Sequence, residues 1–246
     1  MLEHSPPNSP TLSVVFPAYQ EEKRIGMTME AWAKYLSANH PGTEVIVVCD
    51  GCTDGTAQAA RNAFNAENCT LKVIELSPNR GKGNAVSVGV LAAQGEVVAF
   101  TDSDLSYEPE LLGDFLYQIG AGADVVIAQR RKKTQYSGLL RRILAISTRF
   151  LVGNFLLPGI RDTQAGFKVF KQSVARDLFP RAKTKRFLFD LELLVIARSM
   201  DLKIEKVYVD WLDREGSSVR IYVDTIRSLR DLFLIYMRLI LGTYKK

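Results

Sequence analysis

Two aspartates separated by one serine follow an apolar run in the segment VVAFTDSDLS, residues 97–106. A run as continuously apolar as Val97–Phe100 is typical of a strand buried on both faces. The carboxyl end of such a strand opens onto the crevice where open α/β sheets bind ligands. Asp102 and Asp104 would lie side by side there and repel each other unless a cation lies between them or one is protonated. Hard oxygen ligands suit Mg²⁺ or Mn²⁺, usually shared with substrate phosphates. The alternative is a strand followed by an ordinary polar turn.

Basic residues are clustered in the second half of the chain, although the net charge is only +5. Such clusters suit phosphate groups or an anionic membrane surface. No recognised nucleic-acid-binding motif accompanies them, so we expect no nucleic-acid partner. The clustered residues are Arg130, Arg131, Lys132 and Lys133, then Arg141, Arg142 and Arg149, then Arg181, Lys183, Lys185 and Arg186.

The elements that position these side chains alternate between apolar runs and helix-period segments. In the first predicted helix, Ile25, Met29, Trp32 and Leu36 recur on one face. The alternation predicts an α/β fold, a mostly parallel sheet with helices on both sides. The predicted strands are 12–17, 44–49, 71–76, 96–101 and 123–128, and the predicted helices are about 23–38, 54–66, 82–93 and 108–119.

Three further regions complete the predicted organisation. Residues 1–11 are polar and proline-rich, which predicts a disordered tail and shows no signal peptide. One catalytic domain is expected over 12–221, with an arginine-interrupted apolar insert at about 132–160. Residues 222–246 are expected to form a C-terminal amphipathic helix, too short in apolar residues to cross a bilayer of ~30 Å. Both apolar segments suit a membrane interface, the alternative being ordinary packing against the domain. With three cysteines, no disulfide framework is expected, and we expect a cytoplasmic protein held peripherally at the cytoplasmic face of a membrane.

An ordered set of motifs adds a family resemblance over roughly residues 12–220. The motifs are FPAYQEE (16–22), VVCDGCTDGT (47–56), NRGKGNAV (79–86), TDSD (101–104), DTQAGFKVF (162–170) and FLFDLELL (187–194). Together they resemble family 2 glycosyltransferases, whose fold is the Rossmann-like GT-A type. They are most similar to the dolichyl- and polyprenyl-phosphate sugar synthases, and DTQAGFK followed by FDLELL looks like the glucosyltransferase branch.

The resemblance implies a nucleotide-sugar site in the first half of the chain. Glu21 would accept hydrogen bonds from ribose hydroxyls, and Asp50 from the base. Lys82 would contact the donor from the Gly81–Gly83 turn, where two glycines allow close approach near a helix N-terminus, unless this is only a tight turn. Cys49 and Cys52 stand where the family usually has aspartate and serine. The donor-binding residues implied are Pro17, Ala18, Tyr19, Glu21, Asp50, Lys82, Asp102, Ser103 and Arg220.

On the same resemblance, Asp102 and Asp104 hold the divalent ion, Mg²⁺ or Mn²⁺, that bridges the donor diphosphate. Arg130 or Arg131 would clamp an acceptor phosphate. A lipid phosphate needs no general base, since its second ionisation lies near pH ~6, whereas a hydroxyl acceptor would need one and Asp190 is then the candidate. Four further residues line up with motifs near the sugar or acceptor: Asp162, Gln164, Lys168 and Glu192.

We therefore expect an inverting transfer of a hexose, glucose from UDP-glucose, to a polyprenyl or dolichyl phosphate. GDP-mannose is the alternative donor, and a protein or polysaccharide hydroxyl the alternative acceptor. A non-catalytic nucleotide-binding membrane scaffold is an alternative of another class. DSDLS also resembles the nucleophile motif of haloacid-dehalogenase-type phosphotransferases, which place it after their first strand, whereas here it follows the fourth. The oligomeric state is left open.

Overall fold

The computed structural model of the 246-residue chain describes residues 11–131, 156–160, 162–186, 188–210 and 221–245. Most of the predicted tail, most of the predicted insert at 132–160, and Arg220 lie outside these residues.

A seven-stranded sheet forms the centre of the molecule, in the order β3-β2-β1-β4-β6-β5-β7. All neighbouring strands are parallel except that β6 runs antiparallel to both β4 and β5. The strands are β1 (Leu12–Ala18), β2 (Glu44–Asp50), β3 (Thr70–Leu76), β4 (Val97–Phe100), β5 (Val125–Arg130), β6 (Lys168–Lys171) and β7 (Ile204–Val209). The predicted mostly parallel α/β sheet is confirmed, and each of the five predicted strands is present with its ends shifted by up to two residues.

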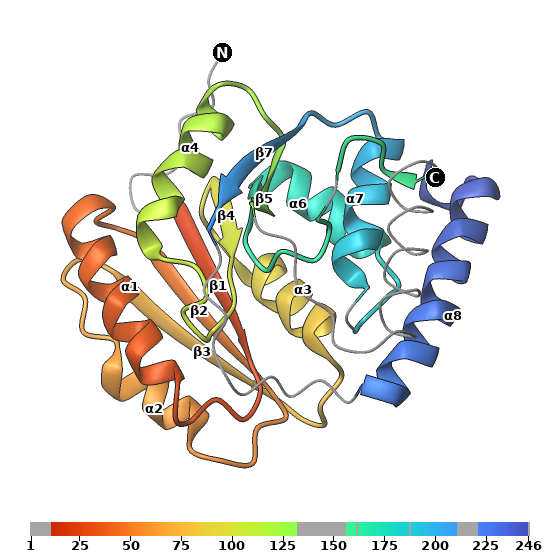
Figure 1. Ribbon diagram of the computed structural model, residues 1–246. Coiled ribbons are helices and arrows are strands. Elements are labelled where there is room, and N and C mark those ends of the chain that lie inside the picture. Colours follow the sequence, from red (N-terminus) through yellow and green to blue (C-terminus); the bar gives the residue numbers. More distant parts are fainter. Residues whose placement is uncertain (1–10, 132–155, 161, 187, 211–220, 246) are drawn as a thin grey trace.

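Helices cover both faces of this sheet (Figure 1). One hydrophobic core joins the sheet to α1, α2 and α4, and a second joins its other face to α3, α6 and α7, with α8 packed beyond α7. The helices are α1 (Ile25–Asn39), α2 (Thr56–Ala63), α3 (Lys82–Ala92), α4 (Leu112–Gly120), α6 (Gln172–Leu178), α7 (Phe189–Ser199) and α8 (Ile221–Ile240), with short 3-10 turns η1 (Pro109–Leu111), η3 (Phe179–Arg181) and η4 (Thr243–Lys245). The predicted helix 108–119 therefore begins as a 3-10 turn at Pro109.

The antiparallel strand β6 positions the second half of the site. Its four residues, KVFK, enter the sheet between β4 and β5 and bring the preceding segment, from Asp162 to Phe167, next to the end of β4. Lys168 begins the strand although its side chain is fully buried. A lysine is seldom buried without a partner, and the partner, Asp190, comes from α7.

The C-terminal helix α8 is amphipathic over its described side chains. Leu232 and Ile235 are buried against α7, whereas Phe233, Tyr236 and Ile240 are 61%, 45% and 60% exposed. Among the described residues, no helix combines the length and apolar character that crossing a bilayer requires.

Candidate active site

The carboxyl ends of β1, β2 and β4 lie at one edge of the sheet, because these three strands are parallel neighbours. The FPAYQEE, VVCDGCTDGT and TDSD motifs each follow one of these ends. The edge is therefore where the predicted donor-binding and metal-binding residues meet, as expected for an open α/β sheet.

The two aspartates after β4 have different surroundings. The ammonium of Lys82, at the start of α3, donates a hydrogen bond to Oδ1 of Asp102. Oδ1 of Asp104 accepts one from the Ser106 backbone N–H at 3.0 Å, and within the described part of the chain Asp104 forms no ion pair. Burial lowers the pKa of Lys82, but the charges of nearby aspartates, Asp102 above all, outweigh it, so that its pKa is raised. Lys82 therefore remains a cation beside the Asp102 carboxylate.

Two residues that the sequence did not single out hold the DSD turn in shape. The Thr28 hydroxyl, on α1, donates to the Ser103 carbonyl oxygen at 2.8 Å, and both residues are buried. The Gly166 backbone lies against Asp102 so closely that an added Cβ would be 2.0 Å from Oδ2. The Gly166 N–H in turn donates to the buried Tyr107 hydroxyl at 3.1 Å. No sequence signal separates Thr28 from an ordinary helix residue, but Gly166 falls inside the DTQAGFK motif.

Asp50 organises the loop that leads into α3. Its side chain is 2% exposed, and its Oδ2 accepts the Gly81 N–H at 2.6 Å. Oδ1 accepts the Arg80 N–H at 3.0 Å, and the Asn79 amide donates to the Asp50 carbonyl oxygen at 2.8 Å. In this structure Asp50 therefore fixes the turn that carries Lys82.

The first loop brings Glu21 toward the metal motif. Pro17 and Ala18 are buried at the end of β1, and Tyr19 is exposed. Glu21 forms a two-point ion pair with Arg24 at 2.6 and 2.7 Å. Burial raises the pKa of Glu21 and the charges of Asp104 and Asp102 add to the rise, so that the pKa lies above its ordinary value although Arg24 lowers it.

The two arginines at the end of β5, Arg130 and Arg131, have different partners. Arg130 reaches Asp162 with Nε at 2.5 Å and NH2 at 3.0 Å, in a partly buried two-point pair. Arg131 is 61% exposed and lies 3.6 Å from Asp210 at the surface. Within the described residues, Arg130 is the one of the two predicted phosphate clamps that contacts another predicted site residue, Asp162. Gln164 is exposed.

Lys168 and Asp190 form the most buried ion pair of the site. Their side chains are 0% and 4% exposed, with Nζ 2.5 Å from Oδ1. Nζ also donates to the Ala165 carbonyl oxygen at 2.7 Å. Burial raises the pKa of Asp190, although Lys168 and Lys82 oppose the rise. The carboxylate that would serve a hydroxyl acceptor as base is thus enclosed and already paired.

In the described part of the chain, Glu192 forms no hydrogen bond or ion pair with another predicted site residue. There its fully buried carboxylate accepts four hydrogen bonds from other parts of the protein. Oε2 accepts the Lys183 and Thr184 N–H groups at 2.9 and 2.6 Å, and Oε1 accepts Arg238 and the Tyr244 hydroxyl at 2.9 and 2.7 Å. Glu192 therefore links the C-terminal segment to α7 through these hydrogen bonds.

A divalent metal fits the residues at the end of β4. The described residues hold no group of three or more histidine, cysteine or acidic side chains suited to a metal. An ion bound by Asp102 and Asp104 would therefore complete its shell with water and donor phosphates, as Mg²⁺ usually does. Asp104 forms no ion pair in the described ranges, so its carboxylate is the more available of the two for a metal ion. Such an ion would neutralise charge on a leaving diphosphate.

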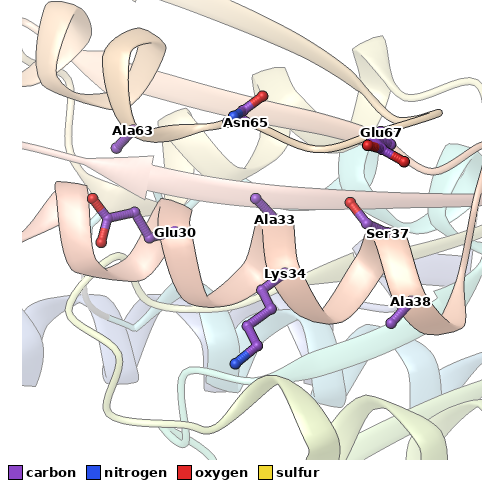
Figure 2. Close-up of a pocket in the computed structure, with 8 residues that line it drawn as sticks. All are labelled: Glu30, Ala33, Lys34, Ser37, Ala38, Ala63, Asn65 and Glu67. Carbon is purple, nitrogen blue, oxygen red and sulfur yellow. The ribbon is translucent and has the colours of Figure 1, made fainter.

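A hollow of about 490 Å³ lies elsewhere, between α1 and the segment after α2 (Figure 2). Figure 2 shows it bounded by one side of α1 and by the chain from Ala63 to Glu67. None of its lining residues belongs to the ion pairs or the acidic turn described above, so we assign it no part in the site.

Comparisons with known proteins agree with this geometry. The family described as "Glycosyl transferase family 2" matches residues 13–179. The dolichyl-phosphate beta-glucosyltransferase of Drosophila melanogaster is 35% identical, over 99% of this chain and 79% of its own length. The human enzyme of the same name is 31% identical, over 97% and 79%.

Among solved structures, glucosyl-3-phosphoglycerate synthase from Mycobacterium tuberculosis, in complex with Mn²⁺ and UDP-glucose, superposes with a TM-score of 0.69. The match has 20% identity and covers 92% of this chain and 79% of that one. A structure described only as that of a mycobacterial protein has a TM-score of 0.70 at 21% identity, over 92% of this chain and 74% of its own. At these identities the likeness concerns the fold, which is the predicted GT-A type. The extent of the family match and the relatives' identity together settle the lineage: the chain belongs to glycosyltransferase family 2.

Proposed function

We propose that this glycosyltransferase moves glucose from UDP-glucose to a dolichyl-type polyprenyl phosphate. Several relatives over nearly the whole chain carry the name dolichyl-phosphate beta-glucosyltransferase. A β-linked product from an α-linked donor requires inversion, which a single in-line attack on the anomeric carbon provides.

The observation that carries the choice of acceptor is the Lys168–Asp190 pair. A hydroxyl acceptor needs a base that can receive its proton. Asp190 is 3% exposed, and its Oδ1 accepts a hydrogen bond from the Lys168 ammonium at 2.5 Å, so it is enclosed and already ion-paired. A lipid monophosphate is already anionic near neutral pH and needs only binding and charge compensation. The buried pair therefore favours a phosphate acceptor.

On the donor side we assign Asp104 and Asp102 to Mg²⁺ or Mn²⁺ and Lys82 to the diphosphate. Lys82 starts α3, so an anion near it would also face the helix N-terminus. Arg130 is our candidate for the acceptor phosphate, and Arg220, which lies outside the described residues, is our second candidate for the donor diphosphate. Glu21 and Asp50 are our candidates for ribose and base. We further propose Pro17, Ala18, Tyr19 and Ser103 as the backbone wall of the nucleotide pocket, and Asp162, Gln164 and Lys168 near the sugar.

We also propose that α8 rests on the cytoplasmic face of a membrane, where the isoprenoid acceptor would be embedded. Its outward side chains Phe233, Tyr236 and Ile240 are large and exposed. Arg176, Arg181 and Lys183 line a hollow with Asp177 and with Thr243, which follows the C-terminal end of α8. An apolar helix face together with nearby basic residues suits an anionic lipid surface.

A product assay tests the transfer. Purified protein is incubated with labelled UDP-glucose or GDP-mannose and with polyprenyl phosphate or the matching polyprenol, with and without Mn²⁺. We expect labelled lipid only from UDP-glucose, the phosphate and the metal together. Labelled mannosyl lipid would show that the donor is GDP-mannose and not UDP-glucose. Glucosylated polyprenol would refute the requirement for a phosphate acceptor. Nucleotide binding without product would indicate a non-catalytic scaffold.

Vesicle sedimentation tests the docking surface. Full-length protein should pellet with vesicles containing phosphatidylglycerol more than with phosphatidylcholine alone. The double variant Phe233→Ser/Ile240→Ser should pellet less. Tyr117→Ser removes a side chain that is 74% exposed on α4, away from α8, and should pellet like the wild type. Equal pelleting of all three proteins would refute α8 as the docking element.

A further inference from the structure

The CDGC turn at the end of β2 contains two thiols that the proposed transfer does not use. Cys49 lies at the penultimate position of β2 and is 1% exposed, and Cys52 follows Gly51 and is half-buried. The chain's third cysteine, Cys69, lies before β3 and contacts the His40 carbonyl oxygen at 3.8 Å. Cys49 and Cys52 are therefore a pair by position.

The structure places these two thiols near each other. Cys49 is the register partner of Ala18 in β1, and the Cys52 Sγ lies 3.5 Å from the Ala18 carbonyl oxygen. Cys52 packs against the buried cluster that contains Cys49. The neighbouring Cys49 thiol is the main reason that the pKa of Cys52 falls to about 7, while Cys52 and burial raise the pKa of Cys49.

This arrangement separates an attacking sulfur from a resolving one. The thiolate is the reactive form of cysteine, and Cys52 reaches it near neutral pH while staying partly accessible. Cys49 is a buried thiol beside it, able to attack a bond formed at Cys52. Burial raises the pKa of Cys69, so that it stays a less reactive thiol.

We propose that Cys49 and Cys52 form a thiol–disulfide exchange site for low-molecular-weight disulfides such as oxidised glutathione, and that the oxidised protein binds the donor nucleotide more weakly. The Cys52 thiolate attacks one sulfur of the disulfide, forming a mixed disulfide and releasing one glutathione thiolate. Cys49 then attacks Cys52 Sγ, the Cys49–Cys52 bond forms, and the second glutathione leaves with the Cys49 proton. Two electrons pass from the protein thiols to the glutathione disulfide.

The link to the donor rests on the proposed function, and it runs through the two residues between the cysteines. The Asp50 carboxylate accepts the Arg80 and Gly81 N–H groups. Gly51 has φ +71°, and a Cβ there would be 2.4 Å from the Asn79 backbone nitrogen. Because the turn packs so tightly on the loop that carries Lys82, a bond that draws Cys52 onto Cys49 must shift Asp50 and that loop.

Thiol counting tests the exchange site. Reduced full-length protein is treated with oxidised glutathione, and the remaining thiols are alkylated. The masses of the intact protein and of its peptides are then measured by mass spectrometry. Wild type and Cys69→Ser should finish with a Cys49–Cys52 disulfide and no glutathione attached. Cys49→Ser should stop with one glutathione on Cys52, and Cys52→Ser should not react. A lasting glutathione adduct on wild-type Cys52, no reaction, or a bond to Cys69 would overturn the site.

Calorimetric titration with UDP and Mn²⁺ tests the coupling. We expect the oxidised wild type to bind UDP about tenfold or more weakly than the reduced protein does. Reduction with dithiothreitol should restore the affinity. Cys52→Ser should bind equally before and after the oxidant. Equal affinity of reduced and oxidised wild type would overturn the coupling. Failure of the reduced protein to bind UDP would instead overturn the proposed function and the coupling with it, while the thiol count decides the exchange site independently.

Discussion

The Lys82 ammonium donates a hydrogen bond to the Asp102 carboxylate, and this contact joins the start of α3 to the end of β4. The negative charges of Asp190 and Asp104 also raise the pKa of Lys82. A cation from the protein thus already lies beside one aspartate of the DSD turn, which leaves Asp104 as the carboxylate most available to a metal.

The first prediction concerns Asp104. Asp104→Asn should lower transfer by about a thousandfold or more, because a metal can contribute several kcal/mol of charge stabilisation to the transition state. Circular dichroism and the melting temperature should stay near wild type, since among the described residues the Asp104 side chain accepts one hydrogen bond, from the Ser106 N–H. Asp114→Asn, at an exposed position on α4, is the matched control and should transfer normally. Full activity of Asp104→Asn, or of wild type in EDTA, would remove the metal role.

The second prediction concerns the close approach of Gly166 to Asp102. An added Cβ would be 2.0 Å from Oδ2, so that Gly166→Ala must displace the carboxylate. Misplacement by about 1 Å can cost about a hundredfold in rate, and the Mn²⁺ concentration for half-maximal activity should rise. Gly120→Ala meets nothing within 4 Å and should be neutral. Equal metal dependence of the two variants would contradict the contact.

The third prediction is a pH dependence of stability at the Arg130–Asp162 pair. Burial raises the pKa of Asp162, but the hydrogen bonds and charge of Arg130, with Lys168, outweigh it and hold the pKa below its ordinary value. The pair's stabilisation is therefore complete above the unfolded pKa of about 3.9 and is lost as pH falls through the folded one.

Urea unfolding at about pH 5 and about pH 3 measures this loss. Asp162→Asn should be less stable than wild type at the higher pH and should lose less free energy of unfolding on acidification. Asp177→Asn, at an exposed position on α6, should follow the wild-type difference. An Asp162→Asn curve with the full wild-type pH dependence would show that the pair is not formed.

The fourth prediction separates a structural from a sugar-binding role for Glu192. Glu192→Gln replaces an acceptor of four hydrogen bonds and leaves Arg238 without its buried partner, which should cost about 3–5 kcal/mol. Chemical unfolding should register this loss, with kcat/KM of the remaining folded protein close to wild type. Glu205 lies in a partly exposed pair, 3.9 Å from Lys203. Glu205→Gln should therefore change neither the free energy of unfolding nor kcat/KM. A stable variant with a raised KM for donor or acceptor would favour the sugar-binding role.

The first half of the fold could be predicted from the sequence because most of its strands contain continuous apolar runs and the apolar residues of α1 recur on one face. Leu12–Ala18 and Glu44–Asp50 are buried along their whole length, and the DSD turn follows β4 as predicted. Strand β6 could not be predicted, because a four-residue run with lysine at both ends resembles a surface loop unless the partner of Lys168 is known.

The same limit applies to the acidic residues of α7. Asp190 and Glu192 are two positions apart in one motif and both are buried. Their partners come from β6 and from the C-terminal segment, Lys168 for one and Arg238 and Tyr244 for the other. Spacing along the chain cannot distinguish a carboxylate that faces the site from one that fastens a helix. Only the tertiary contacts separate the two.

Anomalous diffraction at the manganese absorption edge, from crystals grown with UDP and Mn²⁺, tests the central claim most directly. A single peak should lie between the carboxylate of Asp104 and both phosphates of UDP. A peak bound elsewhere, or UDP phosphates seated without manganese near Asp104, would contradict it.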